Sequence, residues 1–144
     1  MILPDVNLLV RAYDSESAGH DAAHGWWGGL MNGAQPVALP WVTMLGFVRI
    51  TTLRQVLRQP LSAAEACATV REWLVRPHVT ILEPGPRHAD ILFSLLERVG
   101  TAGNLTTDAH LAALAIEHQA ELHSTDADFS RFPGLRWSNP LAGS

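Results

Sequence analysis

Short apolar runs alternate with longer segments of helical periodicity along the whole chain. Runs typical of buried strands occupy residues 1–5, 36–40, 79–82 and 121–125, with a possible last strand at 135–138. Apolar residues recur at helical spacing within residues 7–13, 20–32, 41–53, 62–76, 87–99 and 106–119, and residues 127–132 predict a turn or short helix. The alternation predicts an α/β fold, with a mainly parallel twisted sheet of about four to five strands flanked by helices.

Several local features refine these elements. Ser62 and Glu65 have the S-x-x-E spacing of a capping box, which predicts a helix starting there. Ser15 or Ser17 is a candidate cap for the helix in 20–32. In the helix of residues 41–53 we expect the apolar side to carry Val42, Leu45 and Val48, and in the helix of residues 62–76 we expect Cys67 to be a small buried side chain.

Length and composition fit a single domain spanning residues 1–144. A chain of 144 residues can bury a sizeable core, and 47% hydrophobic with 17% charged residues is typical of a globular protein. No apolar segment reaches the roughly 18 residues of a membrane span, and no signal peptide opens the chain. We therefore expect a cytoplasmic protein without a membrane-embedded part.

The basic residues narrow the possible chemistry. All ten are arginines, which excludes the lysine of a P-loop and the lysine of a Schiff-base enzyme. The formal charge of −4 provides no global attraction to nucleic acid, although local arginines and bound cations can create such a site. Acids, histidines and hydroxyls remain as the candidate reactive groups.

Four aspartates lie where the strands of such a sheet should end. Asp5 closes the first apolar run, and Asp126 and Asp128 follow the run at 121–125. Asp108 stands in the first turn of the helix that precedes that run. Ligands of open parallel sheets bind beyond the carboxyl ends of the strands, so we expect these four acids to converge there. Simpler roles stay open, because Asp108 could be only a helix N-terminal acid, and Asp126 and Asp128 could only cap a turn.

A cluster of carboxylates stays ionised only if a cation neutralises it. Hard oxygen ligands favour Mg²⁺ or Mn²⁺, and Mg²⁺ keeps several of its waters while it takes one or two carboxylates. An ion of this kind lowers the pKa of bound water and stabilises charge on a phosphoryl oxygen. The predicted chemistry is hydrolysis of a phosphodiester.

Three segments give the chain a resemblance to PIN domains, and more narrowly to VapC toxins of bacterial toxin–antitoxin modules. They are PDVNLLV near the start, LPWVTMLGFVRITTLRQVLRQPLS in the middle and NLTTDAHLAALAIEHQAELHSTDADFSRF near the end. The resemblance implies a homodimeric ribonuclease that needs Mg²⁺ or Mn²⁺, cleaves structured RNA such as tRNA or rRNA, inhibits translation and is blocked by a cognate VapB-type antitoxin. It also implies that Asp5 and Asp108 are the primary metal ligands, that Asp126 completes the site, and that Asp128 assists.

One position departs from the family pattern. PIN domains usually carry a glutamate in the helix after the second strand, and the alignment places Gly46 there. This departure keeps open a non-catalytic RNA-binding or regulatory protein of the same fold. A phosphatase with an aspartate nucleophile fits less well, because such enzymes use a second aspartate two residues on, where this chain has Asn7, and a lysine.

Other residues could touch RNA. Arg49, Arg131 and Arg136 are the candidates for phosphate contact, although Arg49 could instead form a structural salt bridge. Aromatic side chains can stack on RNA bases, but three of the five tryptophans lie in apolar patterns typical of a core or a dimer surface. His20 and His24 have a zinc-compatible spacing without a third ligand, so we expect a solvated helix face. His110 should point to a different side of its helix from Asp108.

Overall fold

The computed structural model of the protein describes residues 1–100 and 103–142. Five parallel strands form one sheet in the order β3-β2-β1-β4-β5. The strands are β1 (Ile2–Pro4), β2 (Val37–Pro40), β3 (Val79–Leu82), β4 (Glu121–His123) and β5 (Trp137–Ser138). The predicted α/β class and parallel sheet are confirmed, and the short final strand is present.

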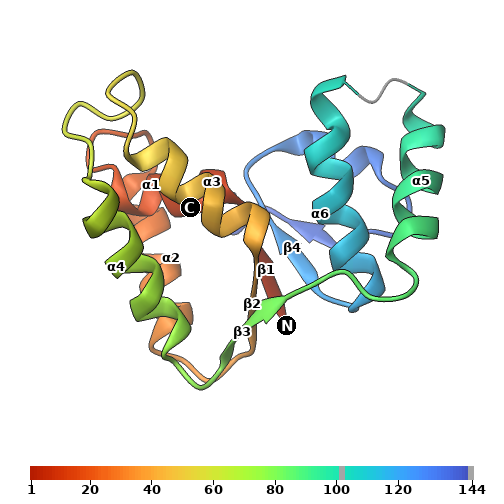
Figure 1. Ribbon diagram of the computed structural model, residues 1–144, viewed down its shortest axis with the longest axis horizontal. Helices are drawn as coiled ribbons and strands as arrows, with labels where there is room; N and C mark the ends of the chain where they lie inside the picture. Colours follow the sequence, from red (N-terminus) through yellow and green to blue (C-terminus); the bar gives the residue numbers. More distant parts are fainter. Residues whose placement is uncertain (101–102, 143–144) are drawn as a thin grey trace.

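Helices flank the sheet on both sides (Figure 1). They are α1 (Val6–Tyr13), α2 (His20–Met31), α3 (Trp41–Thr51), α4 (Ala63–Leu74), α5 (His88–Val99) and α6 (Thr106–Glu117), with short 3₁₀ turns η1 (Gly103–Leu105) and η2 (Ala127–Arg131). In Figure 1, α1 to α4 gather on one side of the strands and α5 with α6 on the other. None of the described helices is long and apolar enough to cross a membrane.

The two faces of the sheet bury two separate apolar clusters. Along β2, Val37 and Leu39 pack with α1 to α4, whereas Ala38 between them packs with α5 and α6. This alternation follows from the two-residue period of a strand. A sheet covered on both faces needs continuous apolar strands, which is why MILP and VALP carry no polar side chain.

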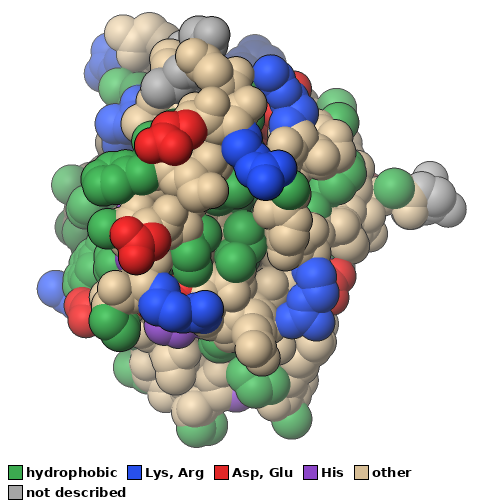
Figure 2. All heavy atoms as spheres, turned by 90° about the vertical axis from the view of Figure 1, so that its right-hand side faces the viewer, with side chains coloured by type: hydrophobic (Ala, Val, Ile, Leu, Met, Phe, Trp, Pro, Cys, Tyr) green, Lys and Arg blue, Asp and Glu red, His purple; other side chains and the backbone are tan. Residues whose placement is uncertain are grey.

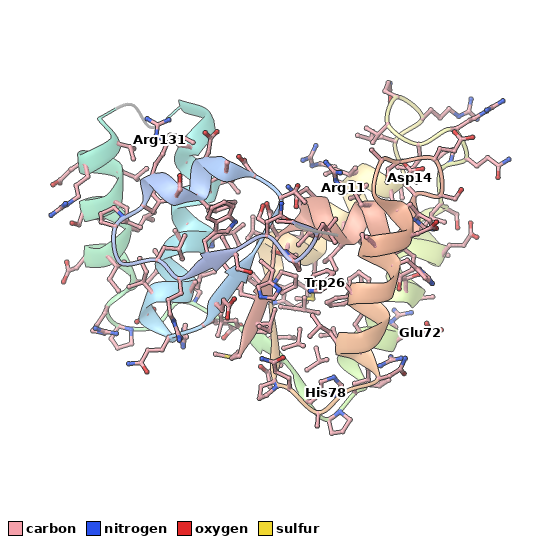
Figure 3. The ribbon with its side chains drawn as sticks, turned by 180° about the vertical axis from the view of Figure 1, so that it is seen from behind. Arg11, Asp14, Trp26, Glu72, His78 and Arg131 are labelled. Atoms are coloured by element: carbon pink, nitrogen blue, oxygen red, sulfur yellow. The ribbon has the colours of Figure 1, made fainter. Side chains whose placement is uncertain are left out.

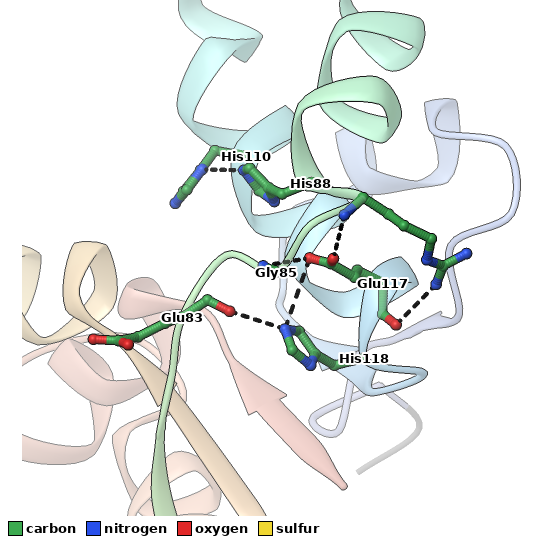
Figure 4. A network of polar contacts seen from close by, with 7 residues as sticks. Glu83, Gly85, His88, His110, Glu117 and His118 are labelled. Atoms are coloured by element: carbon green, nitrogen blue, oxygen red, sulfur yellow. Dashed lines mark hydrogen bonds and ion pairs between the residues drawn. The ribbon is translucent and has the colours of Figure 1, made fainter.

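A carboxylate fixes the connection from β3 to α5 (Figure 4). Glu117, at the end of α6, accepts hydrogen bonds from the backbone N–H of Gly85 at 2.8 Å and of Arg87 at 2.9 Å. A Cβ at Gly85 would lie 2.5 Å from the Glu117 carboxylate, so only glycine permits this approach. The network holds α6 in place beneath the loop that leads into α5.

Two local expectations about helices α2 and α4 are wrong. The residue that precedes α2 as its cap is Gly19, in the left-handed region with a φ of 75°, and neither Ser15 nor Ser17 caps the helix. Helix α4 buries Ala66, Val70 and Trp73, so Cys67 beside this stripe is exposed. The predicted capping box of Ser62 and Glu65 on the same helix is confirmed.

The buried face of α3 also differs from the expected one. It carries Thr43, Met44, Phe47 and Thr51, whereas Leu45 is 61% exposed and Val42 and Val48 are only partly buried. The helix has apolar residues on nearly all of its sides, so the periodicity of its sequence could not predict which side is buried. The two threonines tolerate burial because their hydroxyls donate to the carbonyls of Pro4 and Phe47.

Candidate active site

The order of the strands creates a switch point between β1 and β4. The chain proceeds from β1 through β2 to β3 in one direction, and β4 and β5 then lie on the other side of β1. Asp5 directly follows β1, and Asp126 follows β4 by three residues. Ligands of open parallel sheets bind at this kind of position. The topology therefore brings two of the predicted acids to one edge.

Asp5 is buried, with 7% of its surface exposed, and several donors hold it. Its backbone N–H donates to the carbonyl of His123 at 2.9 Å, which extends the pairing of β1 with β4 by one residue. One carboxylate oxygen accepts from the N–H of Val6 at 2.8 Å and thereby caps α1. The other accepts from the hydroxyl of Ser124 at 2.8 Å. The carboxylate is consequently fixed in orientation.

Ser124 links the two sides of this edge. Its side chain is fully buried, donates to Asp5, and accepts from the backbone N–H of Asp126 at 3.0 Å and from the amide of Asn7 at 3.3 Å. The Asn7 amide also donates to the hydroxyl of Thr125 at 3.0 Å. No role for Ser124 or Thr125 was predicted from the sequence. A signal was present, since the polar triplet Ser-Thr-Asp follows directly after an apolar strand.

The acids other than Asp5 reach the same edge from different elements. Asp126 caps η2 by accepting from the N–H of Asp128 at 2.9 Å, so the capping role left open for it is real. Asp108 lies in the first turn of α6, which ends beside the amino end of β4 and therefore starts at the carboxyl edge. The carboxylates of Asp5, Asp126 and Asp128 all contribute to the raised pKa of Asp108, so the four aspartates lie close to one another.

The pKa shifts record this proximity. Burial, and then repulsion from the carboxylates of Asp5, Asp126 and Asp128, together raise the pKa of the Asp108 carboxyl to about 6. Burial likewise raises the pKa of Asp5, opposed by its hydrogen bonds from Ser124 and Val6 and supported by repulsion from Asp126. A carboxylate surrounded by carboxylates is stabilised by a proton or by a cation.

The donor set fits a hard cation that keeps much of its water. Among residues 1–100 and 103–142, no group of three or more His, Cys, Asp or Glu side chains forms a ready-made metal cage. The ligands offered are carboxylate oxygens at a partly open edge, and the Asn7 side-chain oxygen close by is buried without a hydrogen-bond partner. Mg²⁺ bound through one or two carboxylates, with water in its other positions, matches such a set better than zinc does.

Gly46 has a steric explanation. It lies on α3 facing α1, and a Cβ there would be 3.2 Å from Cγ2 of Val6, the residue after Asp5. Glycine therefore permits a close approach of α3 to the start of α1. Since α3 contains no acidic residue, the carboxylates of this edge come from β1, α6 and η2 and their flanking residues alone.

The three predicted arginines lie in different places. Arg49 is exposed on the last turn of α3. Arg131 ends η2 and lies at the upper end of the side formed by α5 and α6 in Figure 3. Arg136 precedes β5 and donates to the carbonyl of Gln119 before β4, so it stands at the amino end of the strands. Arg136 is therefore at the edge opposite the acids.

The histidines have other partners. His20 and His24 place their Nδ1 atoms 2.7 and 3.0 Å from the carbonyls of Arg11 and Ala12 and so fasten α2 to α1. His110 lies 3.0 Å from His88, nitrogen to nitrogen, on the α5 side of α6 (Figure 4). Burial, and then the neighbouring His88, lower the pKa of His110. Its predicted separation from the face of Asp108 agrees with this pairing.

Comparison with known proteins identifies the family of the whole chain. The sequence matches the PIN domain family over residues 2–135. Ribonuclease VapC33 of Mycobacterium tuberculosis is 49% identical over 141 residues, which cover 98% of this chain and 99% of that protein. The fold is similar to that of VapBC2 from Rickettsia felis, solved bound to a DNA fragment from its promoter, with a TM-score of 0.67, 19% identity, and coverage of 96% of this chain and 98% of that one.

A second solved structure is similarly close in fold. VapC20 of Mycobacterium tuberculosis, described as a Sarcin-Ricin loop cleaving toxin, gives a TM-score of 0.67 at 19% identity and covers 94% of this chain and 99% of its own. Both structural matches extend over nearly the whole sheet and its helices. The family itself is assigned by the sequence match over residues 2–135 and by the identity to VapC33. The chain belongs to the PIN domain family and, within it, to the VapC ribonucleases.

Proposed function

We propose that this protein is a Mg²⁺-dependent endoribonuclease that acts as the toxin of a VapBC pair, with Mn²⁺ as an alternative ion. The observation that carries the proposal is the group of four aspartates at one sheet edge, in which Asp108 has its pKa raised to about 6. In this proposal Asp5, Asp108 and Asp126 hold the metal, and Asp128 orients a ligand or a water. The bound ion supplies an activated water and stabilises charge on the phosphoryl oxygens.

The protein's own contribution is rigidity. Ser124 and the N–H of Val6 fix the Asp5 carboxylate, and the N–H of Asp126 bonded to Ser124 fixes the backbone that carries the third acid. Positioning of this kind lowers the barrier because the reacting groups need not be reoriented during the reaction. The apolar strand before Asp5 therefore serves to hold a charged group in one place.

Substrate and partners follow from the family. VapC20 is described as a Sarcin-Ricin loop cleaving toxin, and VapBC2 was solved bound to a DNA fragment from its promoter. By analogy we propose that this chain cleaves structured tRNA or rRNA, inhibits translation, forms a homodimer and is blocked by a VapB-type antitoxin. The test is incubation of the purified protein with total RNA, followed by end-mapping, in Mg²⁺ and in EDTA. Discrete cuts only in Mg²⁺ are expected, and equal cutting in EDTA would refute the metal dependence.

Replacement of Ser124 probes the proposed rigidity. We expect Ser124→Ala to lower the cleavage rate by about 10- to 100-fold, the usual cost of losing an outer partner of a metal ligand, because Asp5 loses a donor and Asp126 an acceptor. Ser124→Thr keeps the hydroxyl and should restore part of the rate. Ser130→Ala in η2, an exposed serine that bonds only to the carbonyl of Ala127, is the matched control. Unchanged cleavage by Ser124→Ala would remove the serine from the site.

A further inference from the structure

The outer side of α3 carries a stripe of exposed residues. Trp41, Leu45 and Arg49 follow one another at intervals of four residues, so they line one side of the helix. The side chain of Trp41 is 50% exposed, that of Leu45 is 61% exposed, and Arg49 is exposed as well. We call this row the α3 stripe. Its two ends have different chemistry, an indole at one and a guanidinium at the other.

The indole end of the α3 stripe lies beside the acids. In the sheet, Ile2 of β1 is level with Val37 of β2, so three residues further on Asp5 is level with Pro40. Neighbouring strands are about 4.8 Å apart, and Trp41 comes immediately after Pro40. The hydroxyl of Thr43 in the same turn donates to the carbonyl of Pro4 at 3.4 Å. Figure 1 shows α3 starting at the upper ends of β1 and β2 and running away from α6.

Trp41 differs from the other tryptophans in its surroundings. Trp27 and Trp73 are buried in the core, and the indoles of Trp26 and Trp137 donate to His123 and to the carbonyl of Ser124. Within the part of the chain that the structure describes, the side chain of Trp41 has neither a hydrogen bond nor a ring contact. Its ring therefore presents a free flat surface next to the site.

The side chain of Arg49 also has no salt-bridge partner among the described residues. Over the described residues, the only arginine in a salt bridge is Arg58, which pairs with Glu16 at 3.2 Å, so Arg49 has no acidic partner. It lies about 12 Å along the helix from Trp41, as eight residues rise by roughly 1.5 Å each. On the face seen in Figure 2, the side of α5 and α6, arginines are interspersed with acidic and apolar side chains. The guanidinium of Arg49, on the other side of the molecule, is exposed and available to a ligand.

We infer that the α3 stripe binds the RNA substrate, with Trp41 stacking on an unpaired base next to the scissile phosphate and Arg49 contacting a phosphate further along the strand. The inference rests on the proposed ribonuclease function. Proteins read RNA mainly through unstacked bases that they place on aromatic rings, and a guanidinium is suited to bind phosphate. Trp41 would thereby favour RNA whose cleavage site is single-stranded, in a loop or a bulge.

Binding without cleavage tests this inference. The Asp5→Asn protein and a short fluorescent single-stranded RNA of mixed sequence are titrated at several salt concentrations. In this background Trp41→Ala should weaken binding about 5- to 150-fold, and Trp41→Phe should recover most of the loss. The slope of log affinity against log salt should not change. Arg49→Gln should weaken binding and reduce that slope by about 0.7. Phe93→Ala on α5, also an exposed aromatic at 56%, is the control and should have no effect.

Two results would overturn the assignment of the α3 stripe. One is an affinity for RNA that is unchanged by Trp41→Ala. The other is a lower molar mass in solution for Trp41→Ala, measured by light scattering, with RNA affinity per protomer retained, since the stripe would then be a contact between copies of the chain. The proposed function fails by a different result, the lack of RNA cleavage by the wild-type protein in Mg²⁺.

Discussion

Asp5→Asn and Asp108→Asn should each reduce RNA cleavage by more than about 100-fold while the protein remains folded. The expected loss exceeds the roughly 10- to 100-fold that follows removal of an outer partner of a metal ligand, because these two side chains are proposed to touch the ion itself. Asparagine preserves the size of the side chain, and its one oxygen can still accept from the N–H of Val6, while its amide nitrogen can donate to the Ser124 hydroxyl instead of accepting from it. The measurement is the cleavage rate of a mapped RNA site under single-turnover conditions.

The control for these variants is Asp90→Asn. Asp90 is an exposed acid in the first turn of α5, as Asp108 is in the first turn of α6, but it does not contribute to the raised pKa values of the site. We expect it to cleave at the wild-type rate. Circular dichroism and a thermal melt establish that each variant is folded. Full activity in both Asp5→Asn and Asp108→Asn would refute the assigned site.

The second large effect concerns stability without metal. The pKa of Asp108 is raised to about 6 in the folded protein from an ordinary value of 3.8, so between these pH values the folded state binds more protons than the unfolded state. The free energy of unfolding of the metal-free protein should therefore fall as the pH rises from about 4 to 6. Asp108→Asn removes this pH-dependent loss and should be more stable at pH 7 by on the order of 1 kcal/mol, since Asp108 is only partly buried and solvent screens its charge.

Melting temperatures in EDTA across pH 4 to 7 measure this effect. The difference between Asp108→Asn and wild type should be small near pH 4 and largest near pH 7. A difference that is independent of pH would mean that neither burial nor the neighbouring carboxylates raise the pKa of Asp108 in the folded protein. A gain in stability together with a loss of activity is the usual sign of a residue kept for function.

The strand positions were predictable because short apolar runs can only be buried in a sheet covered on both faces. That constraint also located Asp5, Asp126 and Asp128 at strand ends, and the helix ending before β4 located Asp108. The convergence of these acids followed from the rule for parallel sheets, without knowledge of the strand order. The order itself, with its switch point between β1 and β4, came only from the structure.

Side-chain detail was less predictable. The face of α3 could not be read from a helix that is apolar nearly all round, so the exposure of Leu45 and the free indole of Trp41 emerged from the fold. The role of Ser124 depends on a contact across 119 residues of sequence, which no local pattern encodes. The distance of Arg136 from the acids depends on the direction of β5 beside β4.

Because Gly46 replaces the usual glutamate, the main test of the proposed function is whether the protein binds a metal ion. The family pattern offers a glutamate where this chain has a glycine packed near Val6, so the proposed metal site has only the remaining carboxylates as protein ligands. A protein that had lost the chemistry would keep the same fold and the same Asp5 geometry. Binding of the ion therefore distinguishes a working nuclease from a non-catalytic RNA-binding relative.

The most direct measurement is calorimetric titration of the metal-free protein with Mn²⁺ or Mg²⁺ at pH 7, on wild type, Asp5→Asn and the control Asp90→Asn. The account predicts saturable binding to wild type and to Asp90→Asn, little or none to Asp5→Asn, and release of protons that increases as the pH is lowered toward 6. An absence of binding to wild type, with RNA affinity unchanged by EDTA, would contradict it.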